Sequence, residues 1–395
     1  MIDFDFCVPT KLYFGKDKEL QIGDILYSLN VKRVLIVIGK GSIKKSGLFD
    51  RVIEKIKTKN INYSILEGVR ANPEIGLCKK GIEIARDFKA DFILAIGGGS
   101  VIDTAKSIAV GYYYDSDPFD FNLHSVKPLK VLPIGVILTI SASGSEMSNS
   151  CVIQNDSTNI KMGFNSELIR PVFAIENPTL SFTVNKEQTA YGIVDIIMHT
   201  LERYLVESDN NEPADRFAEG LIKSVIEAGK KVMENPCDYK ARAVLMSMSS
   251  LSHCGLTNFG KKFIMPVHQL EHALSGLYPN VAHGAGLALL WPNWAKYYLE
   301  IDANKFACLA HNVFDYRSGN IFDEAKYAIQ AFKDYFAFLN MPSTYTDLNI
   351  SSPNIEKLVE LLTNNGQRVI YHHLKPMDAS VAFKIYQSAN TDWRI

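Results

Sequence analysis

The sequence lacks the features that mark a membrane-spanning, secreted or nucleic-acid-binding protein. Its longest apolar stretch, Val131–Ile140, is far too short to cross a bilayer. The first residues, MIDFDFCVPTKLYFG, are acidic and contain no apolar core of signal-peptide length. With a formal net charge of −1, the chain has no excess of basic residues for a nucleic acid or an anionic membrane. We therefore expect neither partner and no secretion signal.

Closely spaced cysteines are also absent. The six cysteines are scattered along the chain and none belongs to a C-x-x-C motif. Reduced, mostly buried thiols in a cytoplasmic protein are the simplest interpretation. The composition, 47% hydrophobic and 22% charged, is that of an ordinary globular protein. A chain of 395 residues exceeds one ordinary core, so we expect two domains.

The first half of the chain alternates between strand and helix patterns. Near-continuous apolar runs at 34–38 and 92–96 predict buried strands. Such alternation is typical of a parallel sheet with helices on both faces, whose ligands bind at the carboxyl ends of the strands. The predicted elements, in order, are strand 34–38, helix 48–59, strand 63–66, helix 74–88, strand 92–96, helix 100–110 and strand 131–138.

Strand patterns fade after about Thr183 and helical patterns dominate. The predicted helices cover 188–205, 215–234, 239–252, 265–277, 304–313, 323–339 and 354–364. The sequence thus predicts an α/β fold, with an N-terminal parallel-sheet domain over 1–183 and a C-terminal all-helical domain over 184–395. The boundary is expected near Pro178–Asn185, without a flexible linker.

A run of three glycines, Gly97-Gly98-Gly99-Ser100, follows the second buried strand and opens a helix. Glycines let the backbone approach a phosphate closely, and a helix N-terminus offers free N–H groups. The G-x-G-x-x-G fingerprint is absent, so the ordinary Rossmann pattern does not apply. We interpret the loop as a phosphate-binding turn. Asp103, one turn into the helix, is equally suited to a cofactor contact or to stabilising the first turn.

A second glycine cluster, Gly39-Lys40-Gly41-Ser42, follows the first strand. In nucleotide-binding folds a carboxylate at this position would bind the ribose 2′-hydroxyl of NAD and repel a 2′-phosphate. Gly39, Lys40 and Ser42 leave room and a positive charge instead, which favours NADP(H) over NAD(H). The alternative is a solvated loop lysine. A third segment, 138–146, leaves the last predicted strand with small hydroxyl residues, which suits either a nucleotide wall or a capped helix start.

Possible metal ligands gather in the middle third of the chain. Asp195 and His199 are four residues apart, as are His268 and His272, so each pair would lie on one helix face. His283 stands in a nearby glycine-containing segment. Carboxylate and imidazole suit a divalent metal such as Fe(II), Zn or Mn. The other histidines are interpreted as structural: His124, His253, His311, His372 and His373.

A rival interpretation uses only five residues. The segment from His268 to His272 reads H-x-x-E-H, the inverted zinc-protease signature, in which Glu271 would be the general base. That interpretation explains neither the glycine loops nor the pair formed by Asp195 and His199. We therefore treat it as a remote alternative.

Taken together, these motifs resemble the iron-containing alcohol dehydrogenase family, most closely its butanol dehydrogenase-like, NADPH-dependent aldehyde reductase branch. The resemblance runs over nearly the whole chain, and the order and spacing of the motifs are specific. It rests on four segments: Gly97-Gly98-Gly99-Ser100-x-x-Asp103, Leu138-Thr139…Gly144-Ser145-Glu146, Asp195-x-x-x-His199-x-x-Glu202 and His268…His272…His283-Gly284.

The resemblance implies a dinucleotide-binding domain, a helical metal-binding domain and an active site between them. It implies metal ligation by Asp195, His199, His268 and His283, with His272 near the nicotinamide, as a candidate proton relay or an orienting residue. It also assigns cofactor contacts to Gly39, Gly98, Gly99, Ser100, Asp103, Thr139, Ser143, Lys161 and Leu180.

The implied reaction is hydride transfer between NAD(P)H and a small primary alcohol or aldehyde, with Fe(II) or Zn as the Lewis acid, in a homodimer. Within the same superfamily, a polyol dehydrogenase and a dehydroquinate synthase-like lyase are alternatives. The lyase would need more basic residues beside the histidines than the sequence has. A non-enzymatic metal-binding or nucleotide-sensing module is the alternative from another class; it would not oxidise NADPH when an aldehyde is added.

Overall fold

The computed structural model describes residues 1–206, 211–371 and 375–395, so His372 and His373 lie outside the described residues. The chain forms two compact units. One contains Cys7–Val184 and Pro236–Cys254, and the other contains Met1–Phe6, Asn185–Asn235 and Gly255–Ile395. We call them the sheet unit and the helical unit. No described helix combines the length and apolar character needed to cross a bilayer.

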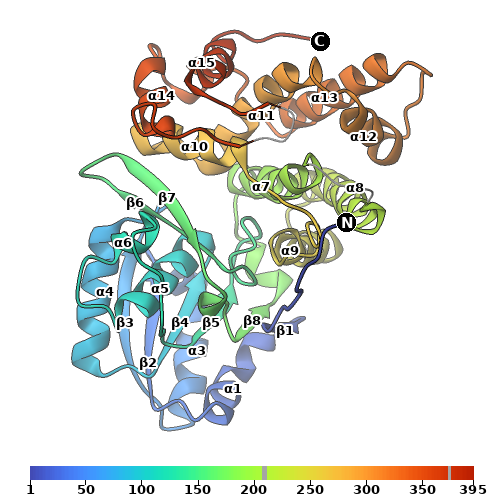
Figure 1. Ribbon diagram of the computed structural model, residues 1–395. Coiled ribbons are helices and arrows are strands. Elements are labelled where there is room, and N and C mark those ends of the chain that lie inside the picture. The colour runs from blue at the N-terminus through green and yellow to red at the C-terminus, as the bar shows by residue number, and fades with distance from the viewer. Residues whose placement is uncertain (207–210, 372–374) are drawn as a thin grey trace. The chain divides into compact units, whose positions relative to one another are not determined.

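The sheet unit is built on a six-stranded sheet in which every neighbouring pair is parallel (Figure 1). This is the parallel sheet that the alternating pattern predicts. In sheet order its strands are β1 (Lys11–Phe14), β8 (Phe173–Glu176), β5 (Ile134–Leu138), β4 (Phe92–Gly97), β2 (Arg33–Gly39) and β3 (Asn62–Val69).

Side chains of β4 alternate between two cores. Ile93 and Ala95 pack with the helices α4 (Ile75–Phe88) and α5 (Gly99–Gly111). Phe92, Leu94 and Ile96 face the opposite core, with residues of α1 (Ile22–Ser28) and α3 (Leu48–Lys57). Because successive strand residues point to opposite faces, a strand buried on both faces must be apolar throughout, as β4 is.

The strand register brings several chain segments to one edge of the sheet. Gly97 pairs with Leu138, and Leu138 pairs with Glu176, so β4, β5 and β8 end side by side. Ile38 near the end of β2 pairs with Ile96. The segments that follow these strands therefore start at the same carboxyl edge, where parallel sheets bind ligands.

The remaining elements of the sheet unit are short, apart from one helix. Its antiparallel hairpin consists of β6 (Ser150–Asn155) and β7 (Ile160–Asn165). The other elements are η1 (Lys18–Gln21), α2 (Ser42–Lys45), α6 (Phe119–Asn122), η2 (Glu167–Ile169), η3 (Pro178–Ser181) and α9 (Tyr239–His253). The helix α9 comes from the second half of the sequence but belongs to this compact unit.

The helical unit contains no strand among its described residues; apart from the blue N-terminal segment Met1–Phe6, it is drawn from green to red in Figure 1. Its helices are α7 (Lys186–Tyr204), α8 (Glu212–Glu234), α10 (Pro266–Leu277), α11 (His283–Leu299), α12 (Asn304–Phe314), α13 (Ile321–Phe338), η4 (Thr346–Leu348), α14 (Ile355–Thr363) and α15 (Ala379–Ser388). The division into functional domains at residue 183 remains a prediction.

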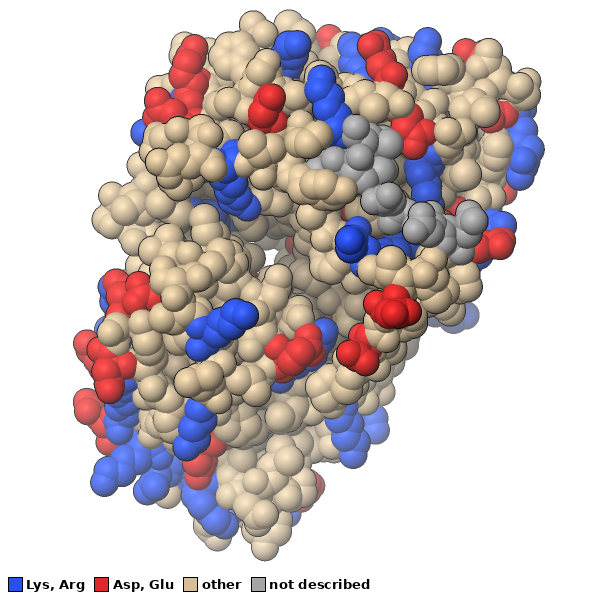
Figure 2. Space-filling view, viewed as in Figure 1, with Lys and Arg blue, Asp and Glu red and all other residues tan. Residues whose placement is uncertain are grey.

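Charged side chains of both signs are interspersed on the face of the molecule in Figure 2. No large patch of one sign appears on that face. This distribution agrees with the small net charge of the sequence.

Candidate functional site

The helix α7 carries the first two predicted ligands. Asn185 caps its N-terminus by accepting a hydrogen bond of 2.8 Å from the backbone N–H of Gln188. One turn separates Asp195 from His199, and the His199 Nε2 atom lies 3.3 Å from Asp195 Oδ1. Both side chains are buried. The i,i+4 spacing in the sequence thus places the carboxylate and the imidazole on one helix face, as expected.

Two further histidines converge on the same carboxylate oxygen. His268 belongs to α10 and His283 begins α11. Their Nε2 atoms lie 3.6 Å and 3.7 Å from Asp195 Oδ1. Four donors at about 2.1 Å from one ion in a tetrahedral arrangement lie roughly 3.4 Å from one another. The separations of the three Nε2 atoms from Asp195 Oδ1 therefore match a site for a divalent metal.

The hydrogen bonding of the donor atoms indicates that the site would hold a cation. Asp195 Oδ1 and His268 Nε2 are buried and have no hydrogen-bond partner among the described residues. A buried carboxylate oxygen without a partner is costly unless a cation compensates it. Nitrogen and oxygen donors suit Fe(II) and Zn alike. The residues present thus fit the metal that the sequence predicts.

Glu202, one turn after His199 on α7, holds His268 in place. The Nδ1–H of His268 donates to Glu202 Oε2, which leaves Nε2 to face Asp195. The same carboxylate accepts from the backbone N–H of Val267 at 2.6 Å and so caps α10. Burial disfavours a charged imidazole, but Glu202 and Asp195 outweigh it and raise the pKa of His268 to about 9. Metal binding must therefore displace a proton from His268.

Glu271 holds His283 in the same way. It lies on α10, is fully buried, and accepts a hydrogen bond at Oε2 from Nδ1 of His283. Gly286 is needed beside it, because a Cβ atom there would lie 2.8 Å from Glu271 Cγ. The residue that would be the base of a zinc protease is thus bound to a histidine of the candidate metal site.

His199 is oriented by a cation rather than a carboxylate. Arg203, one turn further along α7, donates from Nη1 to the carbonyl of His199 at 2.7 Å. The same Nη1 lies 3.3 Å from His199 Nδ1, and its Nε donates to Asn258 at 3.1 Å. Arg203 is almost fully buried. The positions of Glu202, Glu271 and Arg203 fix the orientation of three predicted ligand side chains.

His272 lies beside this cluster but faces a different set of atoms. Ligand atoms of Glu271, His272 and His283 all lie within 4.8 Å of one another. The ring centroid of His272 is 5.8 Å from that of His283 and 6.5 Å from that of His268. His272 is partly exposed, whereas Asp195 and His268 are buried. It therefore lies next to the predicted ligand His283 and is open to solvent.

Two of the histidines predicted to be structural have clear partners elsewhere. His253 in α9 bonds through Nδ1 to the carbonyl of Ser143 at 2.7 Å. His311 in α12 bonds through Nε2 to Glu324 at 2.7 Å. The sequence could not distinguish these from ligands by residue type alone.

The triple-glycine turn lies at the carboxyl edge of the sheet. Gly98 caps α5, and Gly99 and Ser100 form its first turn. A Cβ atom at Gly98 would lie 2.3 Å from Ile140, and one at Gly99 would lie 2.4 Å from Ser143 Oγ. The glycines thus let this turn pack directly against the segment that follows β5.

Most of the other predicted cofactor residues lie along the same edge. Thr139 donates its backbone N–H to the carbonyl of Gly97 at 3.1 Å. Lys161 on β7 donates to Asn72, just beyond β3, at 3.0 Å. Leu180 lies in η3, just after β8. Gly39 ends β2. Together with the glycine turn, these positions line the ends of neighbouring strands.

Asp103 makes hydrogen bonds inside the sheet unit, whereas Lys40 is exposed. Asp103 accepts from Ser145 Oγ at 2.6 Å and from the backbone N–H of Val152 at 3.1 Å. Burial raises the pKa of Asp103, and the nearby Lys106 opposes this shift. Asp103 therefore braces the segment that follows β5. Lys40 is exposed, and so is Ser42.

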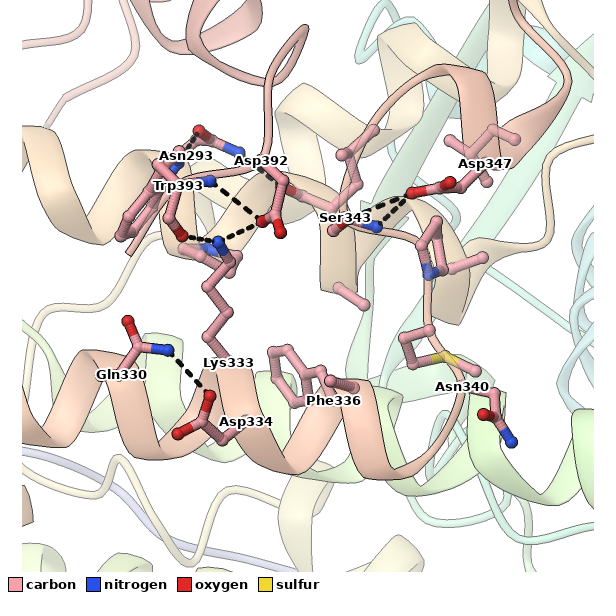
Figure 3. Close-up of a pocket in the computed structure, with 18 of the residues that line it drawn as sticks. Asn293, Gln330, Lys333, Asp334, Phe336, Asn340, Ser343, Asp347, Asp392 and Trp393 are labelled. Atoms are coloured by element: carbon pink, nitrogen blue, oxygen red, sulfur yellow. Dashed lines mark hydrogen bonds and ion pairs between the residues drawn. The ribbon is translucent and has the colours of Figure 1, made fainter. Parts of the chain in front are cut away.

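A cavity of about 550 Å³ lies in the helical unit but includes none of the four predicted ligands (Figure 3). Several of its charged side chains already have partners. Lys333 donates to Asp392 at 2.5 Å, and Asp347 accepts from the backbone N–H of Ser343 at 2.9 Å. The convergence of donor atoms is therefore a better guide to the chemistry than cavity size.

Sequence reasoning did not assign the roles of Glu202, Glu271 and Arg203. One signal was available: an acidic residue stands three positions after both His199 and His268. Glu202 serves the histidine of another helix, so spacing alone could not reveal its partner.

Comparison with known proteins gives consistent matches over nearly the whole chain. Residues 9–178 match the family model described as "Iron-containing alcohol dehydrogenase". Residues 189–389 match the model "Fe-containing alcohol dehydrogenase family, C-terminal".

Curated relatives cover nearly the entire chain. NADH-dependent butanol dehydrogenase A of Clostridium acetobutylicum is 41% identical, over 98% of this chain and 100% of the relative. The NADPH-dependent aldehyde reductase YqhD of Escherichia coli is 30% identical over the same shares. Among solved structures, NADH-dependent butanol dehydrogenase A of Thermotoga maritima has a TM-score of 0.95 and 32% identity, over 99% of both chains.

Proposed function

The chain belongs to the iron-containing alcohol dehydrogenase family and is an NAD(P)-dependent alcohol dehydrogenase or aldehyde reductase; we propose that Asp195, His199, His268 and His283 hold its catalytic metal. Its reaction is reversible hydride transfer between a nicotinamide and a small primary alcohol or aldehyde. The observation that supports this assignment is the convergence of three Nε2 atoms on the buried Asp195 Oδ1 atom, at 3.3 to 3.7 Å.

The protein residues supply position, charge and proton transfer. A bound divalent metal would supply Lewis acidity for the substrate oxygen, and the dinucleotide would supply or accept the hydride. Glu202 and Glu271 hold the protons at Nδ1 of His268 and His283, which directs both Nε2 lone pairs toward Asp195. A ring nitrogen of His272 exchanges a proton between substrate and solvent, because this imidazole is near the cluster and partly exposed.

The metal assignment is tested by removing one donor at a time. Asp195→Ala and His268→Ala should each abolish metal content and aldehyde-dependent NADPH oxidation. His311→Ala is the matched control, because His311 also bonds a carboxylate but lies outside the cluster. Turnover by metal-free wild-type protein would disprove the proposal.

We propose Fe(II) as the working metal and Zn as the alternative that the same donors accept. Metal-free protein reconstituted with each ion separately should recover turnover with Fe(II). Metal content measured alongside activity separates an ion that binds from an ion that supports the reaction.

For the cofactor, we propose binding along the carboxyl edge of the sheet, with the pyrophosphate at Gly98, Gly99 and Ser100. The tight packing of this turn and its position at the N-terminus of α5 support this placement. Asp103, Thr139, Ser143, Lys161 and Leu180 would form the surrounding wall, with Asp103 acting through Ser145 and Val152.

We propose a preference for NADP(H), because no carboxylate stands at Gly39 while Lys40 and Ser42 are exposed beside it. NAD(H) is the second candidate, since the relatives at 41% and 39% identity are named NADH-dependent. The ratio of kcat/KM for NADPH and NADH decides between them. Lys40→Ala should lower that ratio, and a wild-type preference for NADH would refute the proposal.

We also propose that the protein is a cytoplasmic homodimer. The edge strand β1 pairs with β8 on one side, so within the described sheet its other side is available to a second copy. No disulfide is assigned among the cysteines that the structure describes, as expected in a reducing compartment. Light scattering on a sizing column tests the oligomeric state, and a monomer at micromolar concentration would exclude the dimer.

A further inference from the structure

Two buried glutamates in the sheet unit share one serine. Glu146 follows β5 and Glu176 ends β8, and both side chains are buried. Ser250 on α9 lies between them. Its Oγ atom is 2.6 Å from Glu146 Oε1 and also within hydrogen-bond distance of Glu176 Oε1. None of these three residues belongs to the candidate metal site.

The hydrogen count at Ser250 requires a proton on one of the two carboxyl groups. A serine hydroxyl has one hydrogen, so Ser250 can donate to only one glutamate. The second short contact must be a hydrogen bond that Ser250 accepts, and only a protonated carboxyl can donate it. Two ionised carboxylates at this distance in a buried site would also repel each other strongly. The pair therefore carries a single proton.

The surrounding charges favour Glu176 as the protonated group. Lys106 on α5 donates to the Ser145 carbonyl at 2.8 Å and attracts the neighbouring Glu146 carboxylate. Glu176 Oε2 is buried with no hydrogen-bond partner among the described residues, as expected for the carbonyl oxygen of a neutral carboxyl. Burial and the charge of Glu146 raise the pKa of Glu176 well above its ordinary value.

Other ionisable groups lie around this cluster on the packed elements. They are Asp103 and Lys106 on α5, Cys151 on β6, His253 on α9 and Glu19 on η1. Glu19 accepts from Asn177, the residue after Glu176, at 2.9 Å. Burial lowers the pKa of Lys106 to about 8, so Lys106 is the main rival for any alkaline transition in this region.

The cluster connects the segments that we propose to contact the cofactor. Ser249, next to Ser250, accepts from the backbone N–H of Ala142 at 3.1 Å. Gly144 has a φ angle of +66°, and a Cβ atom there would lie 2.4 Å from the Ser249 carbonyl. The helix α9 is thus tied closely to the 139–146 segment, while Glu176 leads directly into η3, which contains Leu180.

We propose that Glu146, Ser250 and Glu176 form a positioning cluster, which shares one proton and holds the 139–146 segment and the start of η3 in the conformation that binds the dinucleotide. The proposal rests on the proposed placement of the cofactor along this edge. The three residues act through the wall segments and do not touch the reacting atoms.

The first test does not need the cofactor. Glu176→Gln replaces the neutral carboxyl with an amide that still donates to Ser250 and cannot ionise. The unfolded wild-type chain loses this proton near the ordinary glutamate pKa of about 4.3, whereas the folded chain retains it to higher pH. The folding equilibrium constant of the wild type should therefore fall relative to that of the variant as the pH rises above about 4.5. The expected decrease is up to tenfold for each pH unit.

Chemical unfolding of both proteins without cofactor, between about pH 5 and 9, measures this difference. A difference that grows with pH supports the proton on Glu176. A constant difference overturns it, because the transition would then belong to Lys106 or another group. Glu19→Gln, which replaces a buried glutamate of the same unit outside the contacts of Ser250, is the control for the general effect of losing one buried carboxyl group.

The second test concerns cofactor binding. Direct titration with NADH avoids the 2′-phosphate, which itself titrates near pH 6. Ser250→Ala should weaken NADH binding by on the order of tenfold, because it removes the bridge between the two carboxyl groups. Ser247→Ala is matched to it, since Ser247 lies on the same helix and bonds only the carbonyl of Ala243 in the described hydrogen bonds.

These experiments can separate a failure of the positioning role from a failure of the cofactor assignment. If wild-type protein binds NADH and Ser250→Ala binds it as tightly, the positioning role is wrong while the cofactor assignment stands. If wild-type protein binds neither NADH nor NADPH, the cofactor assignment fails, while the unfolding experiment still decides the shared proton. Loss of folding in Ser250→Ala but not in Glu176→Gln would support the bridging role of the hydroxyl.

Discussion

The carboxylate of Glu271 accepts a hydrogen bond from Nδ1 of His283, a residue twelve positions later in the chain and at the start of another helix. This contact indicates a role for Glu271 in the H-x-x-E-H segment other than that of a protease base. In a zinc protease Glu271 would activate water, but here its Oε2 atom orients a predicted metal ligand. The protease alternative also leaves Asp195 and His199 unexplained, although both point at the same centre.

Glu271→Gln should weaken metal binding by about tenfold to a hundredfold, because the neutral amide is a poorer acceptor for the Nδ1–H of His283. Competition with a chelator of known affinity measures the effect. Glu324→Gln is the matched control, since Glu324 also bonds a histidine, His311, outside the cluster. Equal metal affinity in Glu271→Gln and the wild type would show that this contact does not tune the site.

Glu202→Ala should destabilise even the metal-free protein. The backbone N–H of Val267 would lose its acceptor inside the protein, and His268 would lose the partner of Nδ1. Leaving such buried donors unsatisfied costs about 1–3 kcal/mol each. Chemical unfolding without metal measures the loss. A variant as stable as the wild type would indicate that water replaces the carboxylate at the start of α10.

Strong periodic patterns were enough to predict the elements that carry the metal ligands. Asp195 and His199 lie on the helix predicted at 188–205, and the structure begins it at Lys186 and ends it at Tyr204. The strand predicted at 131–138 starts only at Ile134. Pro133 directly precedes it and has no N–H for the sheet ladder.

The helix α11 escaped prediction for a physical reason. Almost every residue of His283–Leu299 is buried, so no polar face gives a helical period, and Pro292 lies inside the helix. The short strand β8 is equally hard to predict, because four apolar-rich residues have no distinctive period. The long-range partners, such as Glu202 with His268, depend on tertiary packing that no local pattern encodes.

Gly99→Ala tests the close packing of the glycine turn. The new Cβ atom would lie 2.4 Å from Ser143 Oγ, so the turn or the 139–146 segment must shift. We expect a loss of about 1–3 kcal/mol in the free energy of unfolding and weaker NADPH binding. Gly76→Ala, where nothing lies within 4 Å of the added atom, is the control and should be neutral or slightly stabilising. An unshifted NADPH affinity in Gly99→Ala would contradict the placement of the pyrophosphate.

The thiols should differ sharply in reactivity. Cys237 is exposed, whereas Cys78 and Cys151 are buried. Burial raises the pKa of Cys78 to about 12 and that of Cys151 well above its ordinary value, so neither provides thiolate near neutral pH. A colorimetric thiol reagent at pH 8 should show a fast phase from the exposed Cys7 and Cys237, which the double variant Cys7→Ser/Cys237→Ser removes. Cys78 and Cys151 should react only after unfolding, and rapid modification of either in the native protein would contradict the packing of the sheet unit.

His272→Asn separates proton transfer from metal binding. The ring centroid of His272 is 5.8 Å from that of His283, but His272 is not among the three histidines whose Nε2 atoms surround Asp195 Oδ1. Metal content should therefore remain at the wild-type level, while kcat falls by about a hundredfold to ten-thousandfold and loses the pH dependence that an imidazole gives it. Metal analysis and a pH profile of kcat on the same preparation provide both readouts. Loss of metal would instead make His272 an orienting residue of the metal site, and an unchanged kcat would remove it from the proton path.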